Sequence, residues 1–129
     1  MNNDSHFRNQ YITELTIYQL ETTYSKVFDT MISMKIYRQG KDILVSACDE
    51  HLLGKIFKDG HLQIDASKKF YGGDRVDHST LQSHLKEATI ANLVGKEAVE
   101  CAIQLGLVDK ASILRIKGVP HAQMIRMLS

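Results

Sequence analysis

A pair of strand-like segments, 34–39 and 42–48, constrains the fold of this chain more than any other feature. The connection between them contains Gly40 and is short, which is typical of a tight β-hairpin. In the first segment Met34 and Ile36 alternate with more polar residues, whereas the second segment is almost continuously apolar. We therefore expect a hairpin whose first strand buries one face and whose second strand lies inside a sheet.

Hydrophobic periodicity predicts the remaining elements. They are two further strands, at 61–66 and 113–116, and two helices, at 78–90 and 92–105. Asp77 or Ser79 is a suitable cap for the first helix, and Gly95 is predicted to lie inside the second, where it would make a close packing contact. Residues 121–127 are predicted to be a short strand or a tail. This order favours an α+β fold, with a small, mostly antiparallel or mixed sheet and two helices packed on one face.

The segment SACDEHLLGK, which follows the second strand, combines a thiol, two acids and a histidine. Asp49 occupies a position suited to an N-cap, and residues 50–53 are long enough for one helical turn that ends at Gly54. We expect Asp49 to cap this turn and Cys48 to be buried as a small apolar side chain. Residues 70–73 are expected to form an irregular loop held by aromatic packing.

The composition of the chain changes near residue 31. Residues 1–30 are rich in Asn, Thr, Gln and Tyr and fit neither the strand nor the helix period for long. We interpret 1–30 as a lineage-specific N-terminal extension or as the product of a mis-called start codon. The remainder, 31–129, is predicted to be a single α+β domain, since its length suits one hydrophobic core.

The charge balance and the cysteine content limit the classes of protein to which this chain can belong. The chain has 16 basic and 15 acidic side chains, so it lacks the large positive field of a protein that coats DNA. It shows no secretory start, and no apolar run approaches the roughly 18 residues that span a bilayer. We expect a cytoplasmic protein with no membrane partner, in which Cys48 and Cys101 are reduced and not bonded to each other.

Catalytic and metal-binding patterns are weak in this sequence. Cys48 and His51 have ligand-like spacing but lack the second close pair that structural zinc sites use, so we expect neither a metal nor a cofactor. The glycines match no phosphate-binding motif. A thiol enzyme that uses Cys48 as nucleophile or His121 as base stays an alternative, but the sequence assigns no catalytic residue.

Contact with RNA is the function that the residue types favour most. Basic side chains cluster with aromatic residues after residue 54, and a second basic group lies near the C-terminus. Lysine and arginine contact phosphates, while aromatic rings stack on unpaired bases. The candidate RNA- or ligand-contacting residues are Lys55, Lys68, Lys69, Tyr71, Arg75, Asn92, Lys117, His121 and Gln123. A binding surface of this kind should expose Tyr71, and a protein-interaction adaptor is a further alternative.

Several motifs together resemble one known family. They are MKIYRQGKDILVSACDEHLLGKIF, FYGGDRV, ATIANLVGKEAVECAIQLGLVD and LRIKGVPHAQ, which follow one another from about Met34 to Gln123. This arrangement is similar to the archaeal domain-of-unknown-function family 424. The resemblance implies an archaeal, cytoplasmic, compact α+β domain and transfers no catalytic residue. It also implies a role in translation, with RNA or the ribosome as partner.

Overall fold

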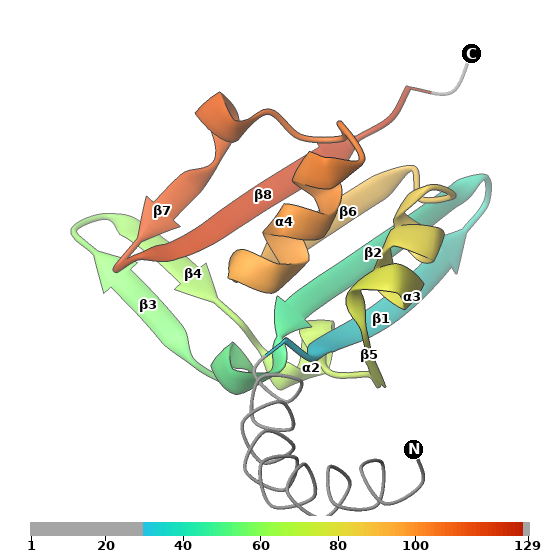
Figure 1. Cartoon of the computed structure of the whole chain (residues 1–129). Coiled ribbons are helices and arrows are strands. Elements are labelled where there is room, and N and C mark those ends of the chain that lie inside the picture. The colour runs from blue at the N-terminus through green and yellow to red at the C-terminus, as the bar shows by residue number, and fades with distance from the viewer. Residues whose placement is uncertain (1–29, 128–129) are drawn as a thin grey trace, which may run out of the picture.

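The computed structural model describes residues 30–127, which form a six-stranded sheet, a separate two-stranded hairpin and short helices (Figure 1). The strands are β1 (Ile32–Gln39), β2 (Asp42–Asp49), β3 (Ile56–Asp59), β4 (Leu62–Asp65), β5 (Asp74–Val76), β6 (Ile90–Val94), β7 (Leu114–Ile116) and β8 (Val119–Ile125). The helices are α2 (Lys68–Tyr71), α3 (His78–Leu85) and α4 (Lys96–Gln104), and the short 3-10 helices are η1 (Glu50–Leu52) and η2 (Lys110–Ser112). The predicted α+β class is confirmed.

The main sheet is mixed, with the strand order β5-β1-β2-β6-β8-β7. β1 and β2 form the predicted antiparallel hairpin, and Gly40 supplies the positive φ of its turn. β2 and β6 run parallel, whereas the other neighbouring strands of this sheet are antiparallel. β2 therefore lies inside the sheet, as its apolar sequence predicts.

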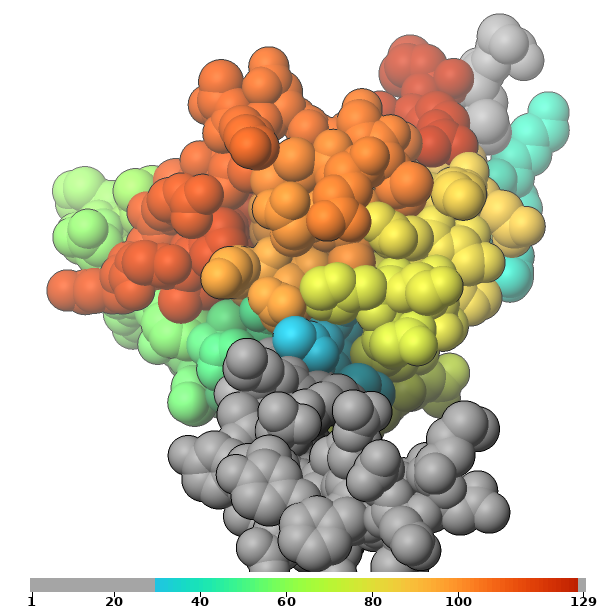
Figure 2. Space-filling view, in the orientation of Figure 1, coloured from blue at the N-terminus to red at the C-terminus, as the bar shows by residue number. Residues whose placement is uncertain are grey.

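The helices α3 and α4 pack on the same face of the main sheet (Figure 1), and the space-filling view shows them closing over that face (Figure 2). Alternate strand residues point into this core, including Ile32, Met34, Val45, Ala47, Ala91, Leu93, Ala122 and Met124. The helices contribute Leu81, Leu85, Ala98, Val99 and Ala102. The core thus uses one side of each strand, and the residues between these positions face the other way.

The first predicted helix is present in a shorter form than 78–90. Asp77 caps α3, because its carboxylate accepts a hydrogen bond of 2.8 Å from the backbone amide of Thr80. α3 ends at Leu85, and the chain then turns into β6. The buried Thr89 fixes this turn, since its hydroxyl accepts a bond of 2.9 Å from the amide of Ile43 in β2.

The second predicted helix, 92–105, is wrong over its first residues, 92–95. Residues 90–94 form β6, a central strand, and α4 begins only after Gly95. A short apolar run suits a buried strand as well as a helix, so periodicity alone did not separate the two. Gly95 is not inside a helix: its φ of 104° makes it the N-cap of α4.

Other predicted strands occur but pair differently. β4 lies within the predicted 61–66 but pairs with β3 in the separate hairpin. β7, predicted at 113–116, is at the edge of the main sheet, where β6 and β8 separate it from β2. Residues 121–127 were predicted to be a short strand or a tail, and most of them belong to β8, a strand between β6 and β7. β5 was not predicted, and α2 contains part of the predicted loop 70–73.

Half of the second sheet face is covered by α2 and the β3–β4 hairpin. Cys48, Leu52, Ile64, Ala66, Tyr71, Val94, Ile116 and Val119 form a second buried cluster there. Within the described part of the chain, 30–127, no helix covers the rest of this face. The predicted extension, 1–30, lies outside the described residues except for Thr30. Among residues 30–127, no helix is long and apolar enough to cross a membrane.

Candidate functional site

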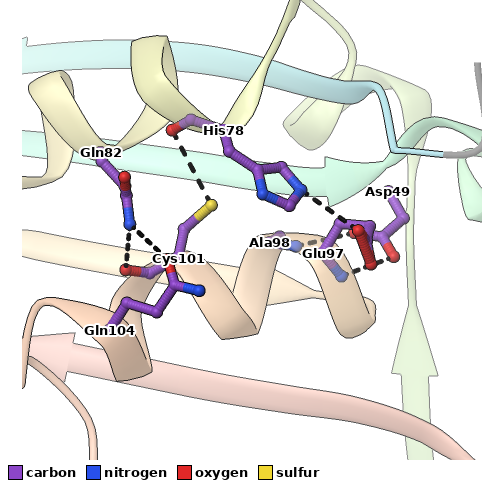
Figure 3. A network of polar contacts seen from close by, with 7 residues as sticks. All are labelled: Asp49, His78, Gln82, Glu97, Ala98, Cys101 and Gln104. Atoms are coloured by element: carbon purple, nitrogen blue, oxygen red, sulfur yellow. Dashed lines mark hydrogen bonds and ion pairs between the residues drawn. The ribbon is translucent and has the colours of Figure 1, made fainter. Parts of the chain in front are cut away.

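The parallel strands β2 and β6 end side by side, and Asp49 from β2 joins their ends to α4. The Asp49 carboxylate accepts hydrogen bonds from the backbone amides of Glu97, at 3.0 Å, and Ala98, at 2.8 Å (Figure 3). These amides belong to the first turn of α4, where backbone donors lack partners inside the helix. Asp49 makes no side-chain bond to η1, so the predicted local cap is wrong: Asp49 caps a helix 48 residues further along the chain.

Gly95 makes this contact possible. A Cβ atom at position 95 would lie 2.3 Å from the Asp49 carboxyl carbon, and the φ of 104° disfavours any other residue as well. The amide of Gly95 is also bound, since it donates to the carbonyl of Pro120 in β8 at 2.9 Å. We call Asp49, Gly95, Glu97 and Ala98 the capping end. It ties three strands and a helix together.

The electrostatics of the capping end follow from its burial. Asp49 is 1% exposed, and this desolvation raises the pKa of its carboxyl, while the amide donors of Glu97 and Ala98 oppose the rise. His78 Nε2 lies 3.2 Å from the Glu97 carboxylate, so α3 is linked to the same place. A cavity of about 250 Å³ borders Asp49 and is rimmed by His51 and Lys96.

A second polar link connects α3 to α4 farther along (Figure 3). The Gln82 side-chain amide donates to the Gln104 side chain at 2.9 Å and to the Cys101 carbonyl at 3.3 Å. Cys101 is buried, which raises its pKa to about 12. Cys48 is also buried and has a pKa raised to about 12 by the same desolvation. Neither cysteine is in a disulfide, as predicted.

The structure does not bring Cys48 and His121 together as a catalytic pair. Cys48 is opposite Val94 in the sheet, and Val94 is in turn opposite His121. One full strand therefore separates the thiol from the imidazole, about 10 Å at the usual strand spacing. Burial lowers the pKa of His121. Among residues 30–127, no cluster of three or more His, Cys, Asp or Glu residues could hold a metal ion.

The part of the second sheet face that no helix among residues 30–127 covers carries two side-chain amides. Asn92 in β6 lies directly opposite Gln123 in β8, and both point away from α3 and α4. Together they are part of a row of residues that lie opposite one another on neighbouring strands. From Asn92 this row continues to Ser46 in β2 and Lys35 in β1. Ser46 is buried because the end of α2 lies over it, and its hydroxyl donates to the Phe70 carbonyl at 2.7 Å.

An aromatic pair borders this row. The rings of Tyr37 and Phe70 are stacked, with centroids 5.5 Å apart and planes inclined by 17°. The ammonium of Lys35 lies 5.2 Å from the Tyr37 ring centroid and donates to the Lys69 carbonyl at 3.1 Å. These residues line a shallow cavity of about 290 Å³. We call Lys35, Tyr37, Phe70, Asn92 and Gln123 the open face.

The structure distributes the predicted contact residues unevenly. Asn92, His121 and Gln123 lie together on β6 and β8, and Lys69 lies beside the aromatic pair. Tyr71, by contrast, is 6% exposed in the second buried cluster, so the expectation of an exposed Tyr71 is wrong. Its ring packs edge-on against Phe70 at 4.8 Å.

The other predicted basic residues do not join the open face. Arg75 is in β5, at one edge of the main sheet, where it pairs with Glu50 at 2.6 Å. Lys117 is in the turn between β7 and β8 at the opposite edge, with a positive φ of 54°. Lys55 precedes β3, and Lys68 in α2 extends its side chain toward Gly54. The two predicted basic groups therefore do not merge into one basic surface.

Sequence reasoning missed Lys35 and Tyr37 as contact residues. The signal was present, because they alternate with the core residues Met34 and Ile36 and must face away from α3 and α4. What the sequence did not show was Phe70, which reaches the same face from an element more than thirty residues away.

Comparison with known proteins identifies the family. A model of the family described as "Protein of unknown function (DUF424)" matches residues 37–127, well over half of the chain. The chain belongs to this family. The DUF424 match includes both the capping end and almost all of the open face, and it confirms the resemblance seen in the sequence motifs.

One solved structure has the same fold as this DUF424 chain. It is the crystal structure of an uncharacterized conserved protein from Methanopyrus kandleri, with a TM-score of 0.62 and 24% sequence identity. The match covers 77% of this chain and 96% of that chain. A likeness at this identity shows the shared fold. No curated protein matches the chain.

Proposed function

We propose that this DUF424 protein is an RNA- or ribosome-associated binding module linked to translation, and that it contacts single-stranded RNA through the open face. One observation carries the proposal. A half-buried lysine–aromatic group lies where α2 meets β1, and a pair of side-chain amides lies beyond α2 on the same face of the sheet. At the capping end, in contrast, the Asp49 carboxylate already accepts hydrogen bonds from the amides of Glu97 and Ala98.

The chemistry of the open face suits unpaired nucleotides. Tyr37 and Phe70 supply aromatic surface on which a base can stack, and stacking of this kind needs no particular sequence. Lys35 and Lys69 place positive charge beside the rings, within reach of a phosphate. Asn92 and Gln123 offer hydrogen-bond donors and acceptors to base edges. Flat sheets with these three components recognise single strands because the bases can be splayed out on them.

The charge of the chain limits the size of the contact. With a formal net charge of +1 and few lysines at the open face, the protein fits a short stretch of RNA rather than a long duplex. Exposed loops and ends of structured RNA, such as those that ribosomes present, are short single strands of this kind. The alternative of a thiol enzyme has less support, because Cys48 is buried and separated from His121 by β6.

The test is binding of a fluorescent single-stranded RNA of mixed sequence at low salt, measured by anisotropy. Replacing Tyr37 by Leu should weaken binding roughly tenfold, the scale of one lost stacking contact. Lys69→Ala should weaken it and reduce its dependence on salt. Lys58→Ala is the matched control, since Lys58 is an exposed lysine on β3, in the separate hairpin, and should leave binding unchanged.

Two outcomes would contradict the proposal. One is the absence of any RNA binding by the folded protein at low salt. The other is an equal loss of binding for Lys58→Ala and Lys69→Ala, which would indicate attraction by general charge. Cosedimentation of the wild-type protein with ribosomes, lost in Tyr37→Leu, would support the proposed setting in translation.

A further inference from the structure

Asn92 occupies a position where its residue type is not explained by the fold. It lies in β6, in the interior of the main sheet, and strands of this kind favour β-branched and aromatic residues over Asn. Its side chain is half-buried. Among residues 30–127, neither Asn92 nor Gln123 has a hydrogen-bonded side-chain partner. A polar residue in a central strand that serves no structural contact indicates a ligand.

The sheet geometry places the two amides as close as neighbouring strands allow. The amide of Gly95 binds Pro120, and the amide of Arg126 binds Thr89 at 2.7 Å, so the even-numbered residues of β8 exchange backbone bonds with β6. Asn92 and Gln123 are therefore a non-hydrogen-bonded pair, whose Cα atoms are about 4.5 Å apart and whose side chains lie side by side.

The open face continues from these amides to the aromatic pair. Asn92 is next to Ser46 in the row, and the end of α2 that carries Phe70 lies over Ser46. One strand, β2, lies between Asn92 and the Tyr37 ring, and two strands lie between Gln123 and that ring, so the separations are about 10 Å and about 14 Å. Nucleotides of one short single strand can span this distance, with one base on the rings and another at the amides.

We infer that the open face selects adenine. This inference rests on the proposed binding of single-stranded RNA and specifies the base that Asn92 and Gln123 read. An amide side chain offers one donor beside one acceptor, which matches the N6 amino group and N7 acceptor of adenine. Guanine presents two adjacent acceptors at the same edge and is suited to Arg or Lys instead. Pyrimidines lack the N7 edge, and their smaller rings cover less of an aromatic surface; the donor and acceptor on their Watson–Crick edge are the competing contact, which the U and C oligomers below measure.

The experiment compares RNA oligonucleotides of equal length made of A, U or C, measured on the folded protein at one salt concentration. The A oligomer should bind roughly tenfold more tightly than U or C, the size of one good bidentate contact. An oligomer of purine riboside, which lacks the N6 amino group, should bind like U. An oligomer of 7-deazaadenosine, which lacks the N7 acceptor, should lose part of the preference.

Substitutions test whether Asn92 and Gln123 cause the preference for adenine. Gln123→Ala, at an exposed position, and the double variant Asn92→Ala with Gln123→Ala should reduce binding of A toward that of U, while binding of U changes little. Tyr37→Leu is the comparison, since it should weaken binding of A and U by the same factor and keep their ratio. Thermal unfolding confirms that each variant is folded; if the double variant is not, Gln123→Ala alone decides.

The outcomes separate this inference from the proposed function. Equal binding of A, U and C that is still weakened by Tyr37→Leu would overturn the choice of adenine and leave RNA binding in place. A preference for A that persists in Gln123→Ala and in the double variant would overturn the role of the two amides. Absence of binding to every oligomer would overturn the proposed function, and the adenine inference with it.

Discussion

The capping end and the open face both place polar side chains on the strands β2, β6 and β8. They differ in whether these side chains have hydrogen-bond partners within the described part of the protein. At the capping end, Asp49 is buried and both of its carboxylate oxygens accept backbone amides. At the open face, Asn92 and Gln123 lie side by side without a side-chain partner among residues 30–127. The first arrangement holds the fold together. The second leaves the two amides for the RNA contact that we propose.

This difference explains why a dense polar motif is a poor guide to function by itself. The segment around Cys48 and Asp49 has the residue types of an active site, yet the Cys48 thiol is buried and the Asp49 carboxylate is used by the fold. Asn92 and Gln123 are far apart in the sequence, yet the fold aligns them on neighbouring strands. The presence or absence of a partner in the structure distinguishes the two cases. The variants below test that distinction.

The largest effect is expected for Gly95→Ala. The new methyl group would overlap the Asp49 carboxylate, and the backbone would be strained at a φ of 104°. Two such penalties together predict a loss of about 3 kcal/mol or more in the free energy of unfolding. Urea denaturation measures it. Gly106→Ala is the matched control: its φ is also positive, at 71°, but a Cβ there meets nothing within 4 Å, so only the backbone penalty of roughly 1 kcal/mol remains.

Asp49→Ala should have the next largest effect. It leaves the amides of Glu97 and Ala98 buried without an acceptor, which predicts a loss of about 2 kcal/mol, at the upper end for a helix cap. Chemical denaturation followed by circular dichroism measures the change. Asp77→Ala removes the exposed cap of α3 and should cost less. Equal losses for the two variants would show that the capping end is not a special link between β2 and α4.

Asn92→Val should have the opposite consequence. Valine suits a central strand, and no side-chain hydrogen bond is lost, so stability should be unchanged or higher by up to about 1 kcal/mol. Binding of RNA should fall in the same variant. Thermal unfolding and anisotropy on one preparation measure both quantities. A large loss of stability would mean that Asn92 has a structural role and would remove the contrast with Asp49.

A smaller, pH-dependent effect is expected at His121, which lies at the end of the open face. Burial lowers its pKa below 6.5, so at a pH just below that value the unfolded chain binds more protons than the folded one. Its contribution to stability is therefore lost as the pH falls below 6.5. His121→Gln should flatten the decline of the melting temperature between pH 7 and pH 5. An unchanged decline would show that other groups control it.

Local sequence patterns predicted the elements that depend on near neighbours. The alternation around Met34 and Ile36 and the turn at Gly40 were sufficient for the β1–β2 hairpin, and Asp77 was sufficient for the start of α3. The strand at 90–94 was missed because its short apolar run is shared by buried helices and strands. Only the tertiary contact between Gly95 and Asp49 fixes that boundary.

The candidate site was less predictable for the same reason. Asn92 and Gln123 were both identified as candidates, but their pairing depends on the register of β6 and β8, which no local pattern specifies. Tyr71 was assigned to the surface and is buried, while its neighbour Phe70 reaches Tyr37. In an aromatic pair of adjacent residues, which ring is exposed depends on the path of α2, and that path is set by contacts with β1 and β2.

The most direct test of the account is to locate the RNA on the protein. Backbone amide resonances of the ¹⁵N-labelled protein should be followed by NMR during titration with a short single-stranded A-rich RNA. The account predicts shifts at Tyr37, Phe70, Asn92 and Gln123, with little change at the amides of Glu97 and Ala98 in the capping end. Shifts concentrated at the capping end, with none at Asn92 and Gln123, would contradict it.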